Sequence, residues 1–316
     1  MDISVKMKNN KIFITGGTGF LGKSLIKKYY NDNEITVYSR DEAKQYYLQK
    51  QYPNINFVCG DVRNYDLMYR ASKGHDIGIF AASFKQIQAC HDNYEEANQV
   101  IVEGAFNSRR CSEENNFESA CFISSDKSRS ATTIYGAMKY VAGESFISNS
   151  QRSSVRLSTV VYGNVLNSTG SILPLMWKSI QDDFSLSLYG EEMTRFFIDV
   201  ENAADMVETS LSYSGYNVIP NLKSMRILDL FEIFKEEFGL KYAVSFPRSC
   251  EKIHEIMASQ DEIPRMKLRN GVYLMHQEEV YDELKFKDNQ YSSQDCIISK
   301  EELYQFLKSK NFYKPL

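Results

Sequence analysis

The stretch KIFITGGTGFLGKSLIKKYY near the start of the chain combines an apolar strand pattern, a glycine-rich turn and an amphipathic helix pattern. Its four glycines satisfy both the GxGxxG and the GxxGxxG spacing. Glycine is needed where the backbone approaches a pyrophosphate closely and turns before a helix whose N-terminus receives the negative charge. This order of strand, turn and helix predicts a dinucleotide site. The residues expected at the cofactor are Gly16, Thr18, Gly19, Phe20, Leu21 and Gly22.

Strand patterns and helix patterns alternate along the first half of the chain. Five further apolar stretches have the length and composition of strands: 34–41, 55–62, 76–83, 117–125 and 153–164. Helical patterns separate them, for example at 42–52, 64–74 and 133–150. Alternation of this kind is typical of a parallel sheet with crossover helices. We therefore expect an α/β fold with a Rossmann-type, doubly wound parallel sheet.

The rhythm changes after residue 164, where the strand patterns become shorter and the charge denser. A helix pattern at 171–181 precedes a strand end and a helix at 194–214, which we expect to return to the sheet. We assign 1–163 to a dinucleotide-binding domain, to which 191–216 returns, and 164–190 and 217–316 to a smaller, interleaved substrate-binding lobe. The last helix is expected to begin after Ser299, which has the N-cap residue type.

Composition excludes several classes of function. The formal net charge is −4 and no long basic run appears, so neither nucleic acid nor an anionic membrane is an expected partner. The six cysteines and four histidines are scattered without a CxxC pair, so we expect free thiols and no metal site. The N-terminus lacks a signal-peptide pattern, and no apolar run could span a bilayer. These features predict a cytoplasmic protein.

The end of the second predicted strand bears on the choice of cofactor. A site that prefers NAD usually places an acid there, to bind the ribose 2′-hydroxyl. Here Ser39 and Arg40 come first, and a hydroxyl with a guanidinium suits a 2′-phosphate, which favours NADP. Asp41 follows and keeps NAD open. Asp61 and Val62, after the third strand, are expected at the adenine, although the pair could instead cap the next helix.

The stretch SSDKSRSATTIYGAMK, residues 124–139, gathers an acid, a phenol and ammonium groups in one short segment. Tyr135 and Lys139 are four residues apart and therefore share one face of the predicted helix. A nearby ammonium favours the phenolate, so Tyr135 could act as the base for an alcohol that loses a hydride. Spacing alone also fits an ordinary amphipathic helix. The glycine loop upstream favours the catalytic interpretation.

These motifs carry a resemblance to a known family. GGTGFLG together with YxxxK resembles the extended short-chain dehydrogenase/reductases. SSDK before YGAMK, together with YSRDE, GDVRN, YGNVLNSTGS, MTRFF and CEKIHE, more narrowly resembles the inverting UDP-N-acetylglucosamine 4,6-dehydratases. The likeness runs in order from Lys11 to the C-terminal helix. Relatives acting on dTDP-glucose carry Asp-Glu instead of Asp-Lys, which makes Lys127 the residue that separates the subfamilies.

The resemblance implies a role for each polar side chain of the segment. Tyr135 takes the proton of the sugar 4-hydroxyl while C4 gives a hydride to NADP⁺, with Lys139 supporting the phenolate. Lys127 removes the C5 proton, Asp126 protonates the departing C6 hydroxyl, and the hydride returns to C6. Ser125 forms a hydrogen bond near the 4-oxygen of the sugar. Reprotonation from the opposite face inverts C5 and gives a UDP-4-keto-6-deoxy sugar for a surface glycan.

The resemblance also implies contacts outside this segment. Ala81 lets the cofactor approach, and the sugar nucleotide is expected at Lys85, Asn164, Val165, Arg195, Arg248 and Glu251. Two guanidiniums suit a diphosphate, and a carboxylate suits a ribose. The chain departs from the family pattern at Thr169, where an arginine is usual, and at Ser249 and Cys250, where proline and glycine are usual.

Three functions remain open on these residues. The 4,6-dehydratase acting on UDP-N-acetylglucosamine as a homo-oligomer, from dimer to hexamer, is what the resemblance implies. A nucleotide-sugar 4-epimerase or ketoreductase needs Tyr135 and Lys139 but not the Asp126–Lys127 pair. An NADP-sensing protein without catalysis would have little use for the tyrosine–lysine pair.

Overall fold

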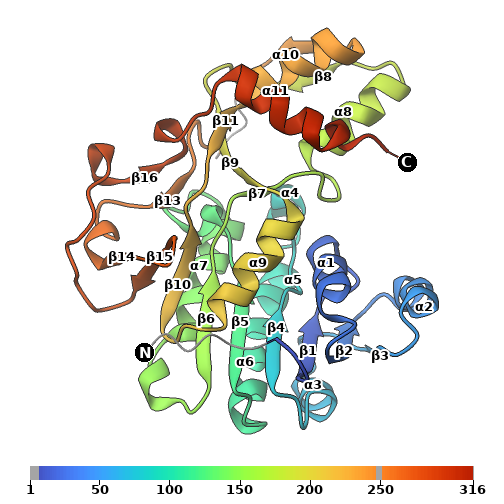
Figure 1. Cartoon of the computed structure of the whole chain (residues 1–316), viewed down its shortest axis with the longest axis vertical. Coiled ribbons are helices and arrows are strands. Elements are labelled where there is room, and N and C mark those ends of the chain that lie inside the picture. Colours follow the sequence, from blue (N-terminus) through green and yellow to red (C-terminus); the bar gives the residue numbers. More distant parts are fainter. Residues whose placement is uncertain (1–6, 247–250, 316) are drawn as a thin grey trace.

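A computed structural model describes residues 7–246 and 251–315. Their largest sheet has the order β14-β15-β10-β6-β5-β4-β1-β2-β3 (Figure 1). The strands from β3 to β10 pair in parallel and the two at the other edge pair antiparallel. The expected doubly wound α/β fold is confirmed. The parallel strands are β1 (Lys11–Thr15), β2 (Glu34–Ser39), β3 (Asn56–Cys59), β4 (Ile77–Phe80), β5 (Ser119–Ile123), β6 (Arg156–Val160) and β10 (Tyr216–Pro220).

Helices cover both faces of this sheet because its central strands are buried on both sides. One face is covered by α1 (Phe20–Tyr29) and α9 (Val200–Ser210), which contact each other. The other face is covered by α3 (Tyr65–Ala71), the π-helix η1 (Gln99–Glu103), α6 (Gly104–Glu114) and α7 (Ile134–Ile147). The remaining helices of this half are α2 (Glu42–Gln51), α4 (Ile87–Asp92) and α5 (Tyr94–Asn98).

A second lobe lies beyond the carboxyl ends of the parallel strands, at the top of Figure 1. Its core joins α8 (Ile172–Gln181), α10 (Ile227–Phe238) and α11 (Lys300–Ser309). Ser299 caps α11 as expected, in a capping box with Glu302. Three small sheets complete this lobe. In the first, β9 (Thr194–Ile198) lies between β7 (Asn164–Val165) and β11 (Ser224–Arg226) and pairs with both. In the other two, β8 (Leu186–Leu188) pairs with β12 (Tyr242–Val244), and β13 (Ile256–Ala258) pairs with β16 (Tyr291–Ser292).

The large sheet extends into the segment that the sequence assigns to the substrate lobe. Residues 217–220 belong to β10, which pairs with β6 through Asn217 and Val218. The antiparallel strands β14 (Met266–Arg269) and β15 (Val272–His276) then add to β10. These strands are short and their partners are distant in sequence, so the local pattern gives no sign that they belong to the sheet.

A buried guanidinium fastens the second half of the chain to the first. Arg129 is 2% exposed, and its Nη1 lies 2.9 Å from carboxylate oxygens of both Glu144, on α7, and Glu262. Gln277 donates to the same Glu144 carboxylate at 2.6 Å. Since a buried charge is costly unless it is paired, this network holds the segment around Glu262 against α7.

The glycine loop packs so closely on α1 that Gly22→Ala should destabilise the protein. A Cβ at Gly22 would lie 2.4 Å from the Cα of Gly17 and 2.6 Å from the carbonyl oxygen of Gly16, both backbone atoms. We expect the free energy of unfolding, measured by urea denaturation without ligand, to fall by about 1–3 kcal/mol. Gly143→Ala in α7 is the control, because its Cβ would be 3.5 Å from the nearest atom, and it should be neutral or stabilising. Equal effects of the two substitutions would contradict the close packing.

Candidate active site

The segment with the acid, the base and the phenol lies at the carboxyl end of the central strand β5. The chain leaves β5 at Ile123 and forms the 3₁₀ turn η2 (Asp126–Ser128), which Ser125 caps by accepting a hydrogen bond from the Lys127 N–H. Helix α7 follows with Thr133 as its N-cap. Ligands of doubly wound sheets bind at this edge, so the fold places the segment where chemistry is expected.

Buried Asp126 and partly buried Lys127 form an ion pair in the turn. The Lys127 Nζ lies 3.2 Å from the Asp126 Oδ1, which also accepts a hydrogen bond of 2.8 Å from the Ser125 hydroxyl. The other oxygen of Asp126 is buried without a hydrogen-bond partner. Burial raises the pKa of Asp126, and neighbouring Glu255 raises it further. Burial lowers the pKa of Lys127, but Asp126 and Glu255 outweigh that effect and raise it overall.

The Tyr135 hydroxyl and the Lys139 ammonium are both buried on α7. Burial raises the pKa of Tyr135 to about 12, although Lys127 and a hydrogen bond with Ser125 act against the rise. Lys139 donates a hydrogen bond of 2.8 Å to the Ile123 carbonyl, and burial lowers its pKa to about 7. The expectation that the ammonium favours the phenolate is therefore not met in the unliganded protein. Desolvation penalises both charged forms and is the largest cause of both shifts.

Three residues expected at the sugar nucleotide lie on β7 or contact the loop after it. The Asn164 Oδ1 accepts a hydrogen bond of 3.2 Å from Lys127, and Val165 pairs with Ile198 of β9. Lys85 donates to the Ser168 hydroxyl at 3.0 Å and to the Thr169 carbonyl, so it braces the loop after β7. This loop is the one in which the usual arginine is replaced by Thr169.

The second lobe contributes a guanidinium and two carboxylates. The Arg195 Nη2 on β9 lies 3.2 Å from the Glu251 Oε1, so two of the residues expected at the nucleotide end meet. Arg248 lies outside the described residues. Glu255 was not predicted from the sequence, yet it lies 3.4 Å from the Lys127 Nζ. The second acid of the CEKIHE stretch was the only available signal, and nothing in the spacing relates it to residue 127.

The glycine loop has the features of a pyrophosphate cradle. Gly16 has a positive φ of 69°, and a Cβ there would lie 2.8 Å from the Ala82 backbone nitrogen, so only glycine fits between the loop and β4. Gly19 caps α1 without a side chain, and the first turn of α1 contains no acid. The amides of this turn can therefore bind an anion. Thr18 is buried in the loop, and Ala81, which follows β4, is half-buried.

The residues after β2 differ in their availability to a ribose. Arg40 is largely exposed, and its Nη1 lies 3.6 Å from the Asp61 carboxylate. Asp41 is engaged as the N-cap of α2 and pairs with Lys44 at 2.7 Å. Ser39 is buried and accepts a hydrogen bond of 2.9 Å from Gln45, so its hydroxyl is partly used by the fold. Val62 is buried beside Asp61.

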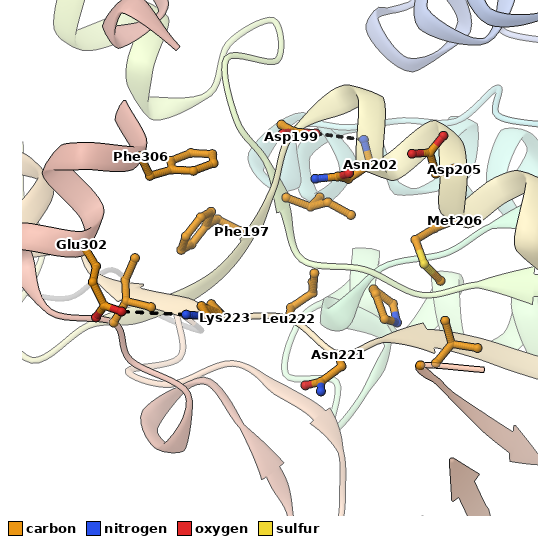
Figure 2. A pocket seen from close by; sticks show the side chains of 15 residues that line it. Phe197, Asp199, Asn202, Asp205, Met206, Asn221, Leu222, Lys223, Glu302 and Phe306 are labelled. Atoms are coloured by element: carbon orange, nitrogen blue, oxygen red, sulfur yellow. Dashed lines mark hydrogen bonds and ion pairs between the residues drawn. The ribbon is translucent and has the colours of Figure 1, made fainter. Parts of the chain in front are cut away.

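A cavity of about 530 Å³ lies elsewhere, between β9, α9 and α11 (Figure 2). Phe197 and Phe306 line one side, and Asp205 and Met206 of α9 line the other. Its charged groups serve the fold, because Asp205 pairs with Lys28 and Lys223 pairs with Glu302. The cavity therefore contains none of the side chains gathered around Asp126.

Comparison with known proteins gives consistent similarities. The family model described as polysaccharide biosynthesis protein matches residues 12–277. The chain is 32% identical to a UDP-N-acetylglucosamine 4,6-dehydratase (inverting) of Campylobacter jejuni, over 81% of this chain and 80% of that protein. It is 30% identical to a UDP-glucose 4-epimerase of Rickettsia bellii, over 80% of this chain and 79% of that protein. The X-ray structure of Pen from Bacillus thuringiensis superposes with a TM-score of 0.89 and 26% sequence identity, over 97% of this chain and 99% of that one.

Within the ranges 7–246 and 251–315, none of the helices is both long and apolar enough to cross a bilayer.

Burial of Lys139 should make stability depend on pH. With its pKa at about 7 in the folded protein and 10.5 as the ordinary value, the unfolded chain binds more protons between these pH values. Stability should therefore rise with pH in this window, by about 1.4 kcal/mol per unit from this residue. Denaturant unfolding of the wild type and of Lys139→Met at pH 7, 8 and 9 measures the difference. We expect the advantage of Lys139→Met to shrink as the pH rises.

Lys73→Met is the control for this pH series, because Lys73 is exposed and its ammonium is hydrated in both the folded and the unfolded state. Its difference from the wild type should stay constant. A constant difference for Lys139→Met as well would show that the lysine is charged in the folded protein.

Proposed function

The chain belongs to the polysaccharide biosynthesis protein family, and we propose that it is a UDP-N-acetylglucosamine 4,6-dehydratase that inverts C5. The product would be a UDP-4-keto-6-deoxy sugar for a surface glycan. The observation that carries the proposal is the ion pair of buried Asp126 and partly buried Lys127, 3.2 Å apart, beside Tyr135. The identity to the Campylobacter jejuni dehydratase supports the choice of substrate.

A nicotinamide cofactor fits the loop between β1 and α1. The Gly16 backbone and the amides at the start of α1 would hold the pyrophosphate, with Ala81 leaving space beside them. Arg40 would bind a 2′-phosphate, whereas Asp41 is occupied by Lys44, which supports NADP over NAD. When bound, the nicotinamide supplies the acceptor for the C4 hydride and returns the hydride to C6.

Tyr135 would remove the proton of the 4-hydroxyl. Its pKa is raised to about 12 in the unliganded protein, so the phenolate needs an additional positive charge close to it. Lys139 does not supply a full positive charge at neutral pH, since burial lowers its pKa to about 7. The cation of the oxidised cofactor is the group that would complete the site. Ser125, which hydrogen-bonds to Tyr135, would orient the phenol and the sugar oxygen.

Elimination would use the Asp126–Lys127 pair as one proton-carrying unit. A neutral amine on Lys127 and a neutral acid on Asp126 hold the same number of protons as the observed ion pair, so transfer along the 3.2 Å contact produces the reactive form. The amine takes the C5 proton, and the acid gives its proton to the C6 oxygen as the C6–O bond breaks and water leaves. The pair then returns to the ion pair seen in the structure.

Arg195 and Glu251 would bind the nucleotide end of the substrate, and Lys85, Asn164 and Val165 would bind its sugar end. Arg248 is proposed together with Arg195 from the sequence alone.

We also propose a cytoplasmic homo-oligomer. Exposed apolar side chains on the adjacent helices α6 and α7 support contact with a second copy: Phe106, Tyr140 and Val141 are 42–48% exposed.

Lys127→Ala should separate oxidation from elimination. The protein and UDP-N-acetylglucosamine are incubated in D₂O and followed by NMR. The wild type should give a 6-methyl signal, a 4-ketone or its hydrate, and deuterium at C5, and the ring couplings report whether C5 is inverted. Lys127→Ala should lower the rate of 6-methyl formation by about 100-fold or more, because the C5 base is missing. Unchanged turnover in this variant would exclude the mechanism.

The second candidate is a nucleotide-sugar 4-epimerase, which the identity to the Rickettsia bellii protein supports. An intact C6 hydroxymethyl with an altered C4 in the same experiment would establish it. Tyr135→Phe should abolish either reaction, whereas a sensing protein would show no chemistry with Tyr135 intact.

Arg40→Ala should weaken NADP⁺ binding by about tenfold or more and leave NAD⁺ binding nearly unchanged. Only NADP⁺ carries the 2′-phosphate, so only its binding loses a hydrogen bond between charged groups. Calorimetric titration with both nucleotides measures the ratio. Asp41→Asn is the control, since Asp41 caps α2, and it should not change the ratio. A wild-type preference for NAD⁺ would contradict the assignment.

A further inference from the structure

Glu255 is a buried carboxylate that no step of the proposed reaction uses. It lies just before β13 and is 4% exposed, with its backbone N–H bonded to the Ser293 hydroxyl at 2.9 Å. Its Oε1 lies 3.4 Å from the Lys127 Nζ and 3.7 Å from the Arg195 Nε. Its Oε2 lies 3.7 Å from the Lys252 Nζ and has no hydrogen-bond partner. One carboxylate of the second half of the chain therefore faces three cations.

The Lys127 ammonium is matched by three oxygen acceptors. They are the Asp126 Oδ1 and the Asn164 Oδ1, both at 3.2 Å, and the Glu255 Oε1 at 3.4 Å. An ammonium group has three N–H donors on a flexible stem, so three acceptors on three different segments fix its position. Without Glu255, the ammonium would lose one of its three oxygen partners, and the Lys127 side chain could rotate.

We propose that Glu255 is a positioning residue, which fixes the Lys127 ammonium beside Asp126 and connects it to Arg195. The inference rests on the proposed function in so far as Lys127 is the C5 base and Arg195 binds the sugar nucleotide. Glu255 touches both side chains, so it joins the groups assigned to the two ends of one substrate. Its role is exerted through Lys127, and no contact with the substrate is required.

The charges around Glu255 predict the direction in which the pKa of its neighbours should shift when its own charge is removed. The groups facing it and Lys127 are Asp126, Tyr135, Arg195 and Lys252. A negative charge at Glu255 raises the pKa of both Lys127 and Asp126. Its removal should lower both, and an opposite charge at this distance typically shifts a pKa by about one to three units.

The first measurement needs no reaction. Unliganded protein is labelled with limiting acetic anhydride at pH 9, and acetylation of Lys127 is quantified by mass spectrometry against the exposed Lys73 of the same chain. Because only the neutral amine reacts, Glu255→Gln should increase labelling of Lys127 by about tenfold or more. Glu255→Asp, which keeps the charge, should increase it much less. Equal labelling in wild type and Glu255→Gln would overturn the proposal.

The second measurement uses turnover of UDP-N-acetylglucosamine across pH, followed by NMR of the 6-methyl product. Glu255→Gln should move the whole pH profile to lower pH by about one unit or more, because both groups of the proton-carrying pair are affected. Glu255→Asp should move it less, but turnover should fall by about tenfold or more because the shorter side chain no longer reaches the ammonium. A profile that does not move in Glu255→Gln would overturn the proposal.

Glu262→Gln controls for general loosening of the same segment. Glu262 is also a buried carboxylate, but its contacts are with Arg129 and the Ser259 N–H. It should lower the denaturation midpoint without moving the pH profile or the labelling of Lys127. If the wild type dehydrates no nucleotide sugar, the proposed function fails, and the acetylation experiment still decides the role of Glu255.

Discussion

The partly buried ammonium of Lys127 is held between carboxylates from two distant segments, Asp126 beside it and Glu255 from the second half of the chain. A charge in the protein interior is tolerated only when it is paired, and breaking such a pair by removing one partner is costly. The segment around Glu255 must therefore lie against the turn after β5. Arg129 imposes the same condition two residues further on, through Glu144 and Glu262. The two halves of the chain meet through ion pairs at the site itself.

Desolvation sets the unliganded state of the other titratable groups. It raises the pKa of Tyr135 and lowers that of Lys139, so the charged form of each residue is disfavoured relative to water although the two residues share a helix face. The same burial makes the site sensitive to any cation that enters, because electrostatic interactions strengthen where water is excluded. In the proposed function, a phenolate at Tyr135 would therefore form once the positive charge of the oxidised cofactor is close to it.

In the proposed function, the tyrosine–lysine pair and the glycine loop would serve an epimerase and a dehydratase alike, whereas the neighbouring turn would distinguish the two reactions. Proton removal and hydride transfer at C4 are common to both. Loss of water across C5 and C6 needs in addition one base and one acid within reach of adjacent carbons. Asp126 and Lys127, which lie 3.2 Å apart, would provide both groups, and Asn164 and Glu255 would keep the proposed base in place.

The sequence by itself determined the six strands from β1 to β6, the glycine loop, the Ser299 cap of the last helix and the tyrosine–lysine pair, because these depend on periodicity, turn chemistry and spacing within one segment. It did not place β10, β14 and β15 in the large sheet, since sheet edges are completed by strands distant in sequence. It missed Glu255, and it gave no sign that burial raises the pKa of Tyr135 to about 12 in the protein without cofactor. Contacts between segments 128 residues apart and the degree of desolvation arise only when the whole chain packs, so only the tertiary structure decided them.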